Sequence, residues 1–300
     1  GLDRAELGRL AAARQMIQHF DTAKLSPAGF RVLVEDFQVA LPDGTLVCDG
    51  LSFRNTFHLN RMAGADFFVP CGGRPESIDI NNVGQLFEED GSARFKYIVE
   101  GANLFFTQDA RLRLEKAGVH LFKDASANKG GVTSSSLEVL AALALNDEEF
   151  GRHMCKQADG SLPAFYQEYV ADVQALIEAN ASREFECLWS ESTRTGKPKC
   201  VLSDDLSVAI VDLRKSLEDT NLWGNLPLRR LIMNEALPAR LLREIGLDNI
   251  LARVPLNYLK AIFGAFLASH FVYEYGTSPG QFAFFEFMSR YHAKAQTAGQ

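Results

Sequence analysis

The chain has 300 residues, and 47% of them are hydrophobic, which is enough to bury the core of one large domain or of two ordinary ones. Its 31 basic and 38 acidic residues give a net charge of -7, and no long basic run concentrates the cations, so we expect no nucleic-acid partner. The longest apolar stretch, residues 254–273, is interrupted by Asn257, Lys260 and His270, so we expect no membrane span.

The cysteine pattern and the N-terminus bear on the kind of protein. None of the five cysteines is part of a CxxC pair, so neither a disulfide framework nor a zinc ribbon is expected, and a reducing compartment suits them. The chain shows no secretory signal. It begins with Gly1 instead of Met, so we expect a piece of a longer protein.

The first half alternates short apolar runs with helical patterns. Four runs are predicted as β-strands, at residues 30–34, 65–69, 95–99 and 119–122. The last three begin about thirty and then about twenty-four residues apart, which is the usual length of a strand, a crossover helix and a turn. Runs this apolar are typical of strands covered on both faces, so we expect a parallel sheet flanked by helices. Residues 39–47, around Pro42-Asp43-Gly44, predict a hairpin inserted at the sheet edge.

The second half carries helical spacing instead. Apolar residues recur at helical intervals over residues 134–144, 164–179, 206–217, 237–245, 258–275 and 282–293. The sequence thus predicts an α/β fold: a partial doubly wound, Rossmann-like parallel sheet that lacks its first phosphate-loop unit, followed by an all-helical C-terminal region. We place the partial dinucleotide-binding domain at residues 1–132, with the hairpin insertion near 37–48, and the helical hinge and C-terminal region at residues 133–300.

Three turns rich in glycine or asparagine follow the predicted strands, at residues 70–73, 100–103 and 124–131. Open parallel sheets bind ligands beyond the carboxyl ends of their strands, so these turns are the candidate site; ordinary turn punctuation is the alternative. Glycine lets the backbone approach a ligand closely, and amide side chains both donate and accept hydrogen bonds. No GxG occurs in the chain, so the dinucleotide fingerprint is absent, and Glu191 occupies the position of the first glycine that a P-loop ending at Gly196-Lys197 would need.

Other chemistry-bearing patterns are weak. The six histidines form neither HxH nor HExxH, so no metal site is expected. Cys71 follows a strand without a nearby histidine to act as its base, which favours a small wall residue over a nucleophile. Residues 88–90 are interpreted as a solvated acidic end, and the phenylalanine-rich residues 282–288 as helix core.

Several segments carry a family resemblance. Residues 96–103, KYIVEGAN, and 124–135, DASANKGGVTSS, resemble the IVEGAN turn and the (S)ANxGGVxxS segment of glutamate dehydrogenases. Residues 65–73 look like the family's strand that ends in a Pro-Cys turn beside the cofactor. The second half is similar to the large NAD-dependent class known from fungi, at residues 210–217, 253–255 and 268–274.

The resemblance implies specific roles for six residues. Pro70, Cys71 and Gly72 would line the cofactor cleft, Asn103 would lie against the nicotinamide ribose, and Asn128 would lie near the nicotinamide amide. Ser135 matches the serine that binds the side-chain carboxylate of glutamate, and a hydroxyl at a helix start suits an anion. A simple helix cap or a surface hydroxyl is the alternative for Ser135, and its neighbours Ser134 and Ser136 leave a register error of one residue open.

The implied activity is oxidative deamination of L-glutamate to 2-oxoglutarate and ammonia with NAD. The family's phosphate loop, its substrate-binding lysines and its catalytic lysine and aspartate lie N-terminal to the matched region, so no catalytic residue is expected in this chain, and the chain alone should be inactive. A dehydrogenase for another amino acid and a non-catalytic regulatory or assembly module of the same ancestry are the alternatives. The resemblance also implies a homo-oligomer in the cytoplasm, with mitochondria left open.

Overall fold

The structure, a computed structural model, describes residues 3–298. It divides into two compact units, Gly1–Asp66 with Asn81–Phe95, and Phe67–Ile80 with Lys96–Gln300. The predicted boundary between residues 132 and 133 falls inside the second unit, and that division stays a prediction.

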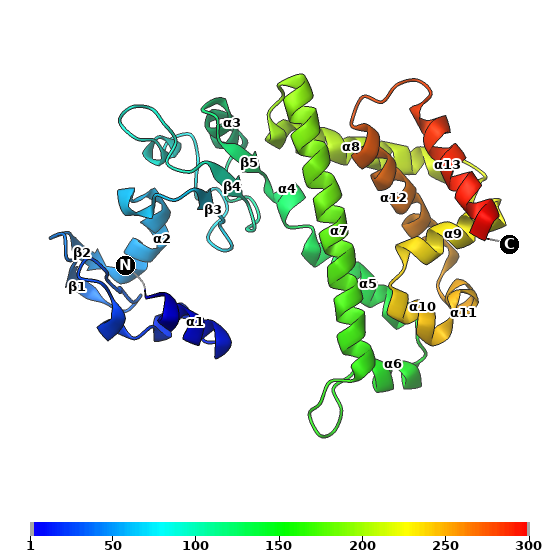
Figure 1. Cartoon of the computed structure of the whole chain (residues 1–300), viewed down its shortest axis with the longest axis horizontal. Coiled ribbons are helices and arrows are strands. Elements are labelled where there is room, and N and C mark those ends of the chain that lie inside the picture. Colours follow the sequence, from blue (N-terminus) through cyan, green and yellow to red (C-terminus); the bar gives the residue numbers. More distant parts are fainter. Residues whose placement is uncertain (1–2, 299–300) are drawn as a thin grey trace. The chain divides into compact units, whose positions relative to one another are not determined.

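The first unit contains α1 (Arg4–Ala12), the strands β1 (Phe37–Ala40) and β2 (Leu46–Asp49), and α2 (Gly50–Thr56), joined by short 3-10 helices (Figure 1). The predicted hairpin is confirmed: β1 and β2 are antiparallel, with Val39 opposite Val47. The Asp43 carboxylate accepts a hydrogen bond from Thr45 N at 2.9 Å, and Gly44 supplies the positive φ that the turn requires. The hairpin forms a two-stranded sheet of its own, so its predicted place at the edge of the parallel sheet is wrong.

The predicted strand at residues 30–34 is also wrong, although the structure describes all five residues. A turn uses the hydrogen-bonding groups that a strand would need, because Leu33 N donates to the Asp36 carboxylate at 2.7 Å and Leu33 O accepts from Asp36 N at 3.1 Å. The backbone of Gly50 also packs directly on Leu33 O, where a Cβ would clash.

The second unit begins with the predicted parallel sheet. Its strands are β3 (Phe67–Phe68), β4 (Tyr97–Val99) and β5 (His120–Phe122), which lie in that order, with both pairs parallel. Helix α3 (Gln108–Lys116) is the crossover from β4 to β5. The expected crossover helix between β3 and β4 is absent: residues 69–96, all of them described, contain the 3-10 helix Val83–Leu86 instead, and residues 81–95 belong to the first unit.

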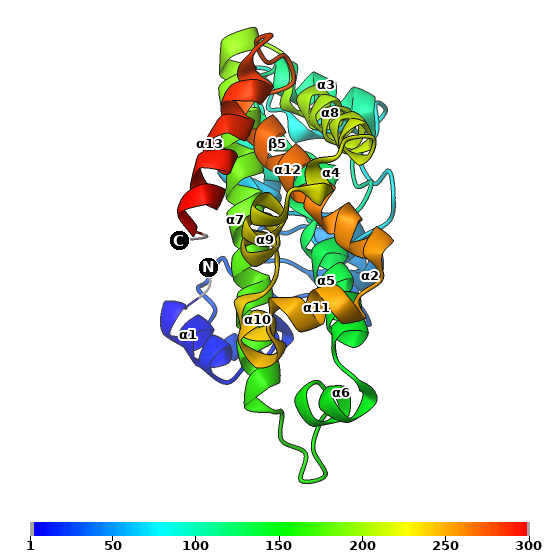
Figure 2. The same cartoon turned by 90° about the vertical axis from the view of Figure 1, so that its right-hand side faces the viewer.

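The rest of the second unit is helical, as predicted (Figures 1 and 2). Its helices are α4 (Asp124–Ala127), α5 (Gly130–Ala144), α6 (Asp147–His153), α7 (Ala164–Thr195), α8 (Lys199–Glu218), α9 (Leu226–Ala236), α10 (Ala239–Ile245), α11 (Leu247–Arg253), α12 (Leu256–Tyr275) and α13 (Ala283–Ala298).

Prolines and glycines set the helix ends. Pro163, Pro198, Pro238 and Pro255 stand directly before α7, α8, α10 and α12, where their missing N–H leaves no hydrogen bond unmade. Gly196, with φ of 72°, ends α7 in the left-handed conformation. Helix α7 runs sixteen residues beyond the predicted segment 164–179, because neither proline nor glycine interrupts residues 180–195.

Helix α7 contacts α5, α8, α10 and α12 (Figure 2). Side chains of these helices form much of the main hydrophobic core. Leu140, Leu188, Leu202 and Leu267 are buried there. The phenylalanine-rich end is split: Phe287 is buried, as expected for helix core, whereas Phe282 and Phe285 are exposed. Among residues 3–298, no helix is both long and apolar enough to cross a membrane.

Candidate functional site

The turns that follow β3 and β4 meet at the carboxyl end of the sheet. Pro70 O accepts a hydrogen bond from Ala102 N at 2.7 Å. Gly101 allows this approach, because a Cβ there would lie 3.0 Å from Cys71 Sγ and 3.2 Å from Pro70 O. Pro70 is buried, while Cys71 and Gly72 are exposed and available to a ligand.

The turn that follows β5 joins the same group through Asn128. Its Nδ2 donates to Gly101 O at 3.4 Å and to the Oδ1 atom of Asn103 in a short hydrogen bond. Asn103 is exposed and Asn128 is half-buried, so both amides lie at the surface of the cluster. The structure therefore brings together the five residues that the sequence assigns to the cofactor, and the cofactor role itself stays a prediction.

Ser135 lies elsewhere on the same segment, in the second turn of α5. The helix begins at Gly130, so the expected helix-start hydroxyl is wrong, and so is the helix-cap alternative, because the residue at the cap position is Lys129. Ser135 is exposed, and its hydroxyl has no hydrogen-bond partner among the described residues. The hydroxyls of Ser134 and Ser136 differ, because they donate to helix carbonyls, Gly131 O at 3.0 Å and Val132 O at 2.9 Å. Of the three serines, Ser135 is thus the one whose hydroxyl is free for a ligand.

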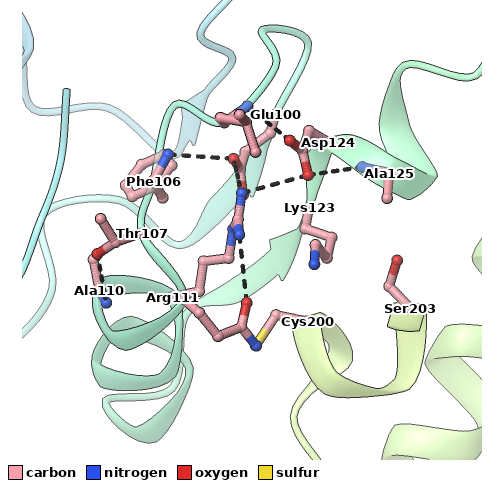
Figure 3. Close-up of polar contacts among 12 residues, drawn as sticks. Glu100, Phe106, Thr107, Ala110, Arg111, Lys123, Asp124, Ala125, Cys200 and Ser203 are labelled. Atoms are coloured by element: carbon pink, nitrogen blue, oxygen red, sulfur yellow. Dashed lines mark hydrogen bonds and ion pairs between the residues drawn. The ribbon is translucent and has the colours of Figure 1, made fainter. Parts of the chain in front are cut away.

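A buried ionic cluster lies beside the turns that follow β4 and β5 (Figure 3). Arg111 of α3 donates from Nε and Nη2 to the two carboxylate oxygens of Glu100 at 2.7 and 2.8 Å, and its Nη2 also lies 3.4 Å from the Asp124 carboxylate. All three side chains are nearly inaccessible to solvent. Burial alone would lower the pKa of Arg111, but the hydrogen bonds and charge of Glu100, with the charge of Asp124, outweigh it and raise that pKa. The guanidinium therefore stays charged between two carboxylates.

This cluster fixes the backbone of two candidate turns. Asp124 accepts from Leu104 N at 2.7 Å and from Ala125 N at 2.8 Å (Figure 3). The backbone N of Glu100 donates to Phe122 O at 2.9 Å. Glu100 and Asp124 could have been suspected from the sequence, since each follows an apolar strand. Arg111 gave no such signal, because nothing local shows that one arginine of a polar helix is buried.

Helix α8 attaches the helical region to the base of the site. Lys199 N and Cys200 N, at the start of α8, donate to the Glu115 carboxylate of α3 at 2.8 and 2.9 Å. The hydroxyls of Ser126 and Ser203 lie 2.6 Å apart, and Lys123 pairs with the Asp204 carboxylate at 2.8 Å. Side chains of a distant helix thus hold the α4 segment that leads to Asn128.

A cavity of about 490 Å³ lies between one face of the sheet and α7. Phe67, Tyr97, Val99 and Phe122 line it from the sheet, and Ser126 and Ala127 line it beside Asn128. Its α7 wall consists of Ala181, Glu184, Phe185, Leu188 and Trp189. The rings of Phe67 and Tyr97 stack with centroids 4.6 Å apart. The walls are mainly apolar, which suits the exclusion of water from a neighbouring ligand.

The residues present fit one part of a dinucleotide. Amides that both donate and accept, with exposed backbone at Cys71 and Gly72, suit a nicotinamide and its ribose. The chain has no GxG, so it offers no glycine-rich loop for the pyrophosphate. Within the part that the structure describes, no group of three or more His, Cys, Asp or Glu residues could hold a metal ion.

Comparisons with known proteins identify the family of the chain. The family model for glutamate/leucine/phenylalanine/valine dehydrogenases matches residues 1–196. The chain is 57% identical over 290 residues to the NAD-specific glutamate dehydrogenase of Neurospora crassa, 57% identical over 288 residues to glutamate dehydrogenase 2 of Dictyostelium discoideum, and 44% identical over 305 residues to the NAD-specific glutamate dehydrogenase of Saccharomyces cerevisiae. These alignments cover 97%, 96% and 99% of this chain but 28% of each relative. No solved structure matches the chain significantly.

Proposed function

The chain belongs to the glutamate/leucine/phenylalanine/valine dehydrogenase family, and we propose that it forms the nicotinamide side of the cofactor cleft in a longer, NAD-dependent glutamate dehydrogenase. That enzyme would oxidatively deaminate L-glutamate to 2-oxoglutarate and ammonia. The proposal of a longer enzyme rests on the relatives, of which the chain spans 28% of the length. The names of these relatives support both NAD and glutamate.

One observation carries the cofactor assignment: Asn128 donates hydrogen bonds to Gly101 O and to Asn103, and so joins the turns beyond two neighbouring strands. Open parallel sheets bind their ligands beyond the carboxyl ends of the strands, and this cluster of amides lies there. When bound, NAD supplies the hydride acceptor for oxidation at Cα of the amino acid.

The residues of this chain then have separate tasks. Asn103 and Asn128 would hold the ribose and the amide of the nicotinamide, and the Pro70–Gly72 turn would line the cleft beside them. The free hydroxyl of Ser135 would donate to the side-chain carboxylate of glutamate and so favour an acidic substrate. Proton transfer would fall to residues outside this chain, because no part of it matches the family's catalytic lysine and aspartate.

The test is NADH formation by the purified full-length protein with L-glutamate, L-leucine, L-phenylalanine and L-valine. We expect turnover with glutamate at least about a hundredfold more efficient than with the apolar amino acids, because a site built to pair a charged group discriminates strongly against substrates that lack it. The 300-residue chain alone should give no turnover. Equal efficiency with leucine would contradict the glutamate assignment, and turnover by the chain alone would contradict the placement of the catalytic groups elsewhere.

Two further proposals rest on the family resemblance alone. We propose that the full-length enzyme is a homo-oligomer, and that it is cytoplasmic. Light scattering of the purified protein tests the first, and imaging of a tagged protein expressed at its natural level tests the second.

A further inference from the structure

Glu184, in the middle of α7, is a buried carboxylate with no role in the site as described so far. Its side chain is 3% exposed. Lys129 Nζ donates to its two oxygens at 2.6 and 2.5 Å, and Tyr273 Oη of α12 donates to it at 2.7 Å. These partners lie 55 and 89 residues away in sequence, so the contact ties together three distant segments.

The carboxylate lies beside the predicted cofactor residues. Glu184 lines the cavity of about 490 Å³ on the face of the sheet. It also lines a second cavity of about 160 Å³, together with Lys129, Gly130 and Tyr273. Ser126 and Ala127 line both cavities, so the segment that leads to Asn128 has open space on this side, and packing alone does not fix it.

Lys129 stands where two helices meet, between Asn128, the C-cap residue of α4, and Gly130, which begins α5. No side chain caps the start of α5, and Lys129 O accepts from Thr133 N at 3.0 Å. A Cβ at Gly130 would lie 3.5 Å from the Ile177 side chain, so the start of α5 is close to α7 here. The ion pair with Glu184 is therefore a polar link that connects residues 128–130 to α7.

We propose that Glu184 is a positioning residue for the cofactor, which acts through Lys129 to fix the orientation of the Asn128 amide. This inference rests on the proposed function and adds the long helix α7 to the cofactor site. Without the carboxylate, the Lys129 ammonium would turn to solvent, to which its side chain is already 40% exposed. The Asn128 segment could then shift toward the two cavities, and a displacement of about 1 Å at a binding group is enough to cost a large factor in affinity or rate.

The experiment compares Glu184→Gln with Glu191→Gln in the full-length protein. Glu191 is a matched control, because it is a buried carboxylate two turns further along α7 and pairs with Arg194 of the same helix. Calorimetry gives the Kd for NAD, and steady-state kinetics give the KM for NAD and kcat. We expect Glu184→Gln to raise both NAD constants by about five- to twentyfold, with kcat changed by less than about threefold, which is the signature of lost binding rather than lost chemistry. The Kd and KM for NAD of Glu191→Gln should stay within about twofold of those of the native protein.

A double-mutant cycle isolates the ion pair. Lys129→Met should raise the Kd for NAD as much as Glu184→Gln, and the double variant should be no worse than either single one, because all three lack the same contact. Lys129→Arg, which keeps a cation at this position, should bind NAD with most of the native affinity that Lys129→Met loses. If Glu184→Gln fails to fold, Tyr273→Phe, which keeps the ion pair but removes one of its hydrogen bonds, should still weaken NAD binding by about two- to fourfold.

Native NAD constants in Glu184→Gln, or an equal loss in Glu191→Gln, would overturn the inference. Additive effects of Lys129→Met and Glu184→Gln would also overturn it. The failure of the proposed function looks different: the native full-length protein would bind NAD, with the variant effects above, but would not oxidise glutamate.

Discussion

Asn128 donates a hydrogen bond from its amide nitrogen to the side-chain oxygen of Asn103, 25 residues earlier in the chain. The contact joins the two turns that follow β4 and β5, and it orients both amides at the carboxyl end of the sheet. Because the Asn103 oxygen is an acceptor in this bond, its amide nitrogen is directed away from Asn128 and can donate to a ligand.

We predict that Asn103→Ala and Asn128→Ala each weaken NAD binding in the full-length enzyme. Loss of a hydrogen bond in a partly desolvated site costs about 1–3 kcal/mol, or roughly ten- to a hundredfold in affinity. The two effects should not add, because the residues contact each other. Kinetics with varied NAD measure the loss. The control is Asn249→Ala on α11, because the Asn249 amide donates to Ile245 O, away from these turns. An unchanged NAD dependence in both variants would remove these turns from the site.

Substrate preference should depend on Ser135. Ser135→Val would remove a charge-assisted hydrogen bond to the side-chain carboxylate of glutamate. Transition-state stabilisation for glutamate relative to norvaline, obtained from the ratio of their kcat/KM values, should fall by about 2–3 kcal/mol. Ser134→Val and Ser136→Val are matched controls, because their hydroxyls already donate to helix carbonyls. A preference that moves with Ser134 or Ser136 instead would mean that the register is off by one residue. A preference unmoved by all three would remove the support that this chain gives to an acidic substrate.

The buried cluster of Glu100, Arg111 and Asp124 should matter for stability. Arg111→Met would leave two carboxylates buried without their cation, at a cost of about 3–5 kcal/mol in the free energy of unfolding. Lys116→Ala, at the exposed end of the same helix, should change it by less than about 0.5 kcal/mol. Urea unfolding followed by circular dichroism measures both. A stable Arg111→Met protein would show that the cluster does not hold the turns.

His270 should make stability pH-dependent. Burial lowers its pKa to about 4, against an ordinary value of 6.5 in the unfolded chain. Between these two values the unfolded chain binds a proton that the folded protein does not, so the free energy of unfolding falls as the pH drops from about 6.5 to about 4. The charged groups that act on the ring are Arg183 of α7, Glu274 of α12 and Lys294 of α13.

The test is the pH dependence of unfolding in His270→Gln. Urea titrations are made between pH 4 and pH 7 at intervals of about half a pH unit. The free energy of unfolding, plotted against pH, should change less steeply in the variant than in the native protein. Equal slopes in the two proteins would mean that the imidazole takes up its proton in the folded state as readily as in the unfolded one.

The parts of the site that the sequence predicted depend on local signals. Gly101, Asn103 and Asn128 stand in turns directly after apolar strands, so both the strands and the meeting of the turns follow from the pattern. The hairpin at β1 and β2 follows in the same way from Pro42-Asp43-Gly44. Residues 30–34 show the limit of such signals, because the Asp36 carboxylate captures Leu33 N and forms a turn in an apolar run.

Long-range contacts account for what the sequence did not predict. Arg111 and Glu184 look like surface residues of polar helical segments until their partners are known, and those partners lie 11 to 89 residues away. The contacts made by the buried face of α7 depend in the same way on α5, α8, α10 and α12, which lie elsewhere in the chain. A periodic pattern shows which face of a helix is buried, but it does not show which charged residue lies opposite another.

Hydrogen–deuterium exchange of the full-length protein with and without saturating NAD tests most directly whether the three candidate turns bind the cofactor. If this chain forms the nicotinamide side of the cofactor cleft, peptides that cover residues 70–73, 100–104 and 124–131 should exchange more slowly with NAD, while the loop at residues 196–198 exchanges as before. Protection confined to regions outside this chain, with exchange in these three turns unchanged, would show that the nicotinamide binds elsewhere.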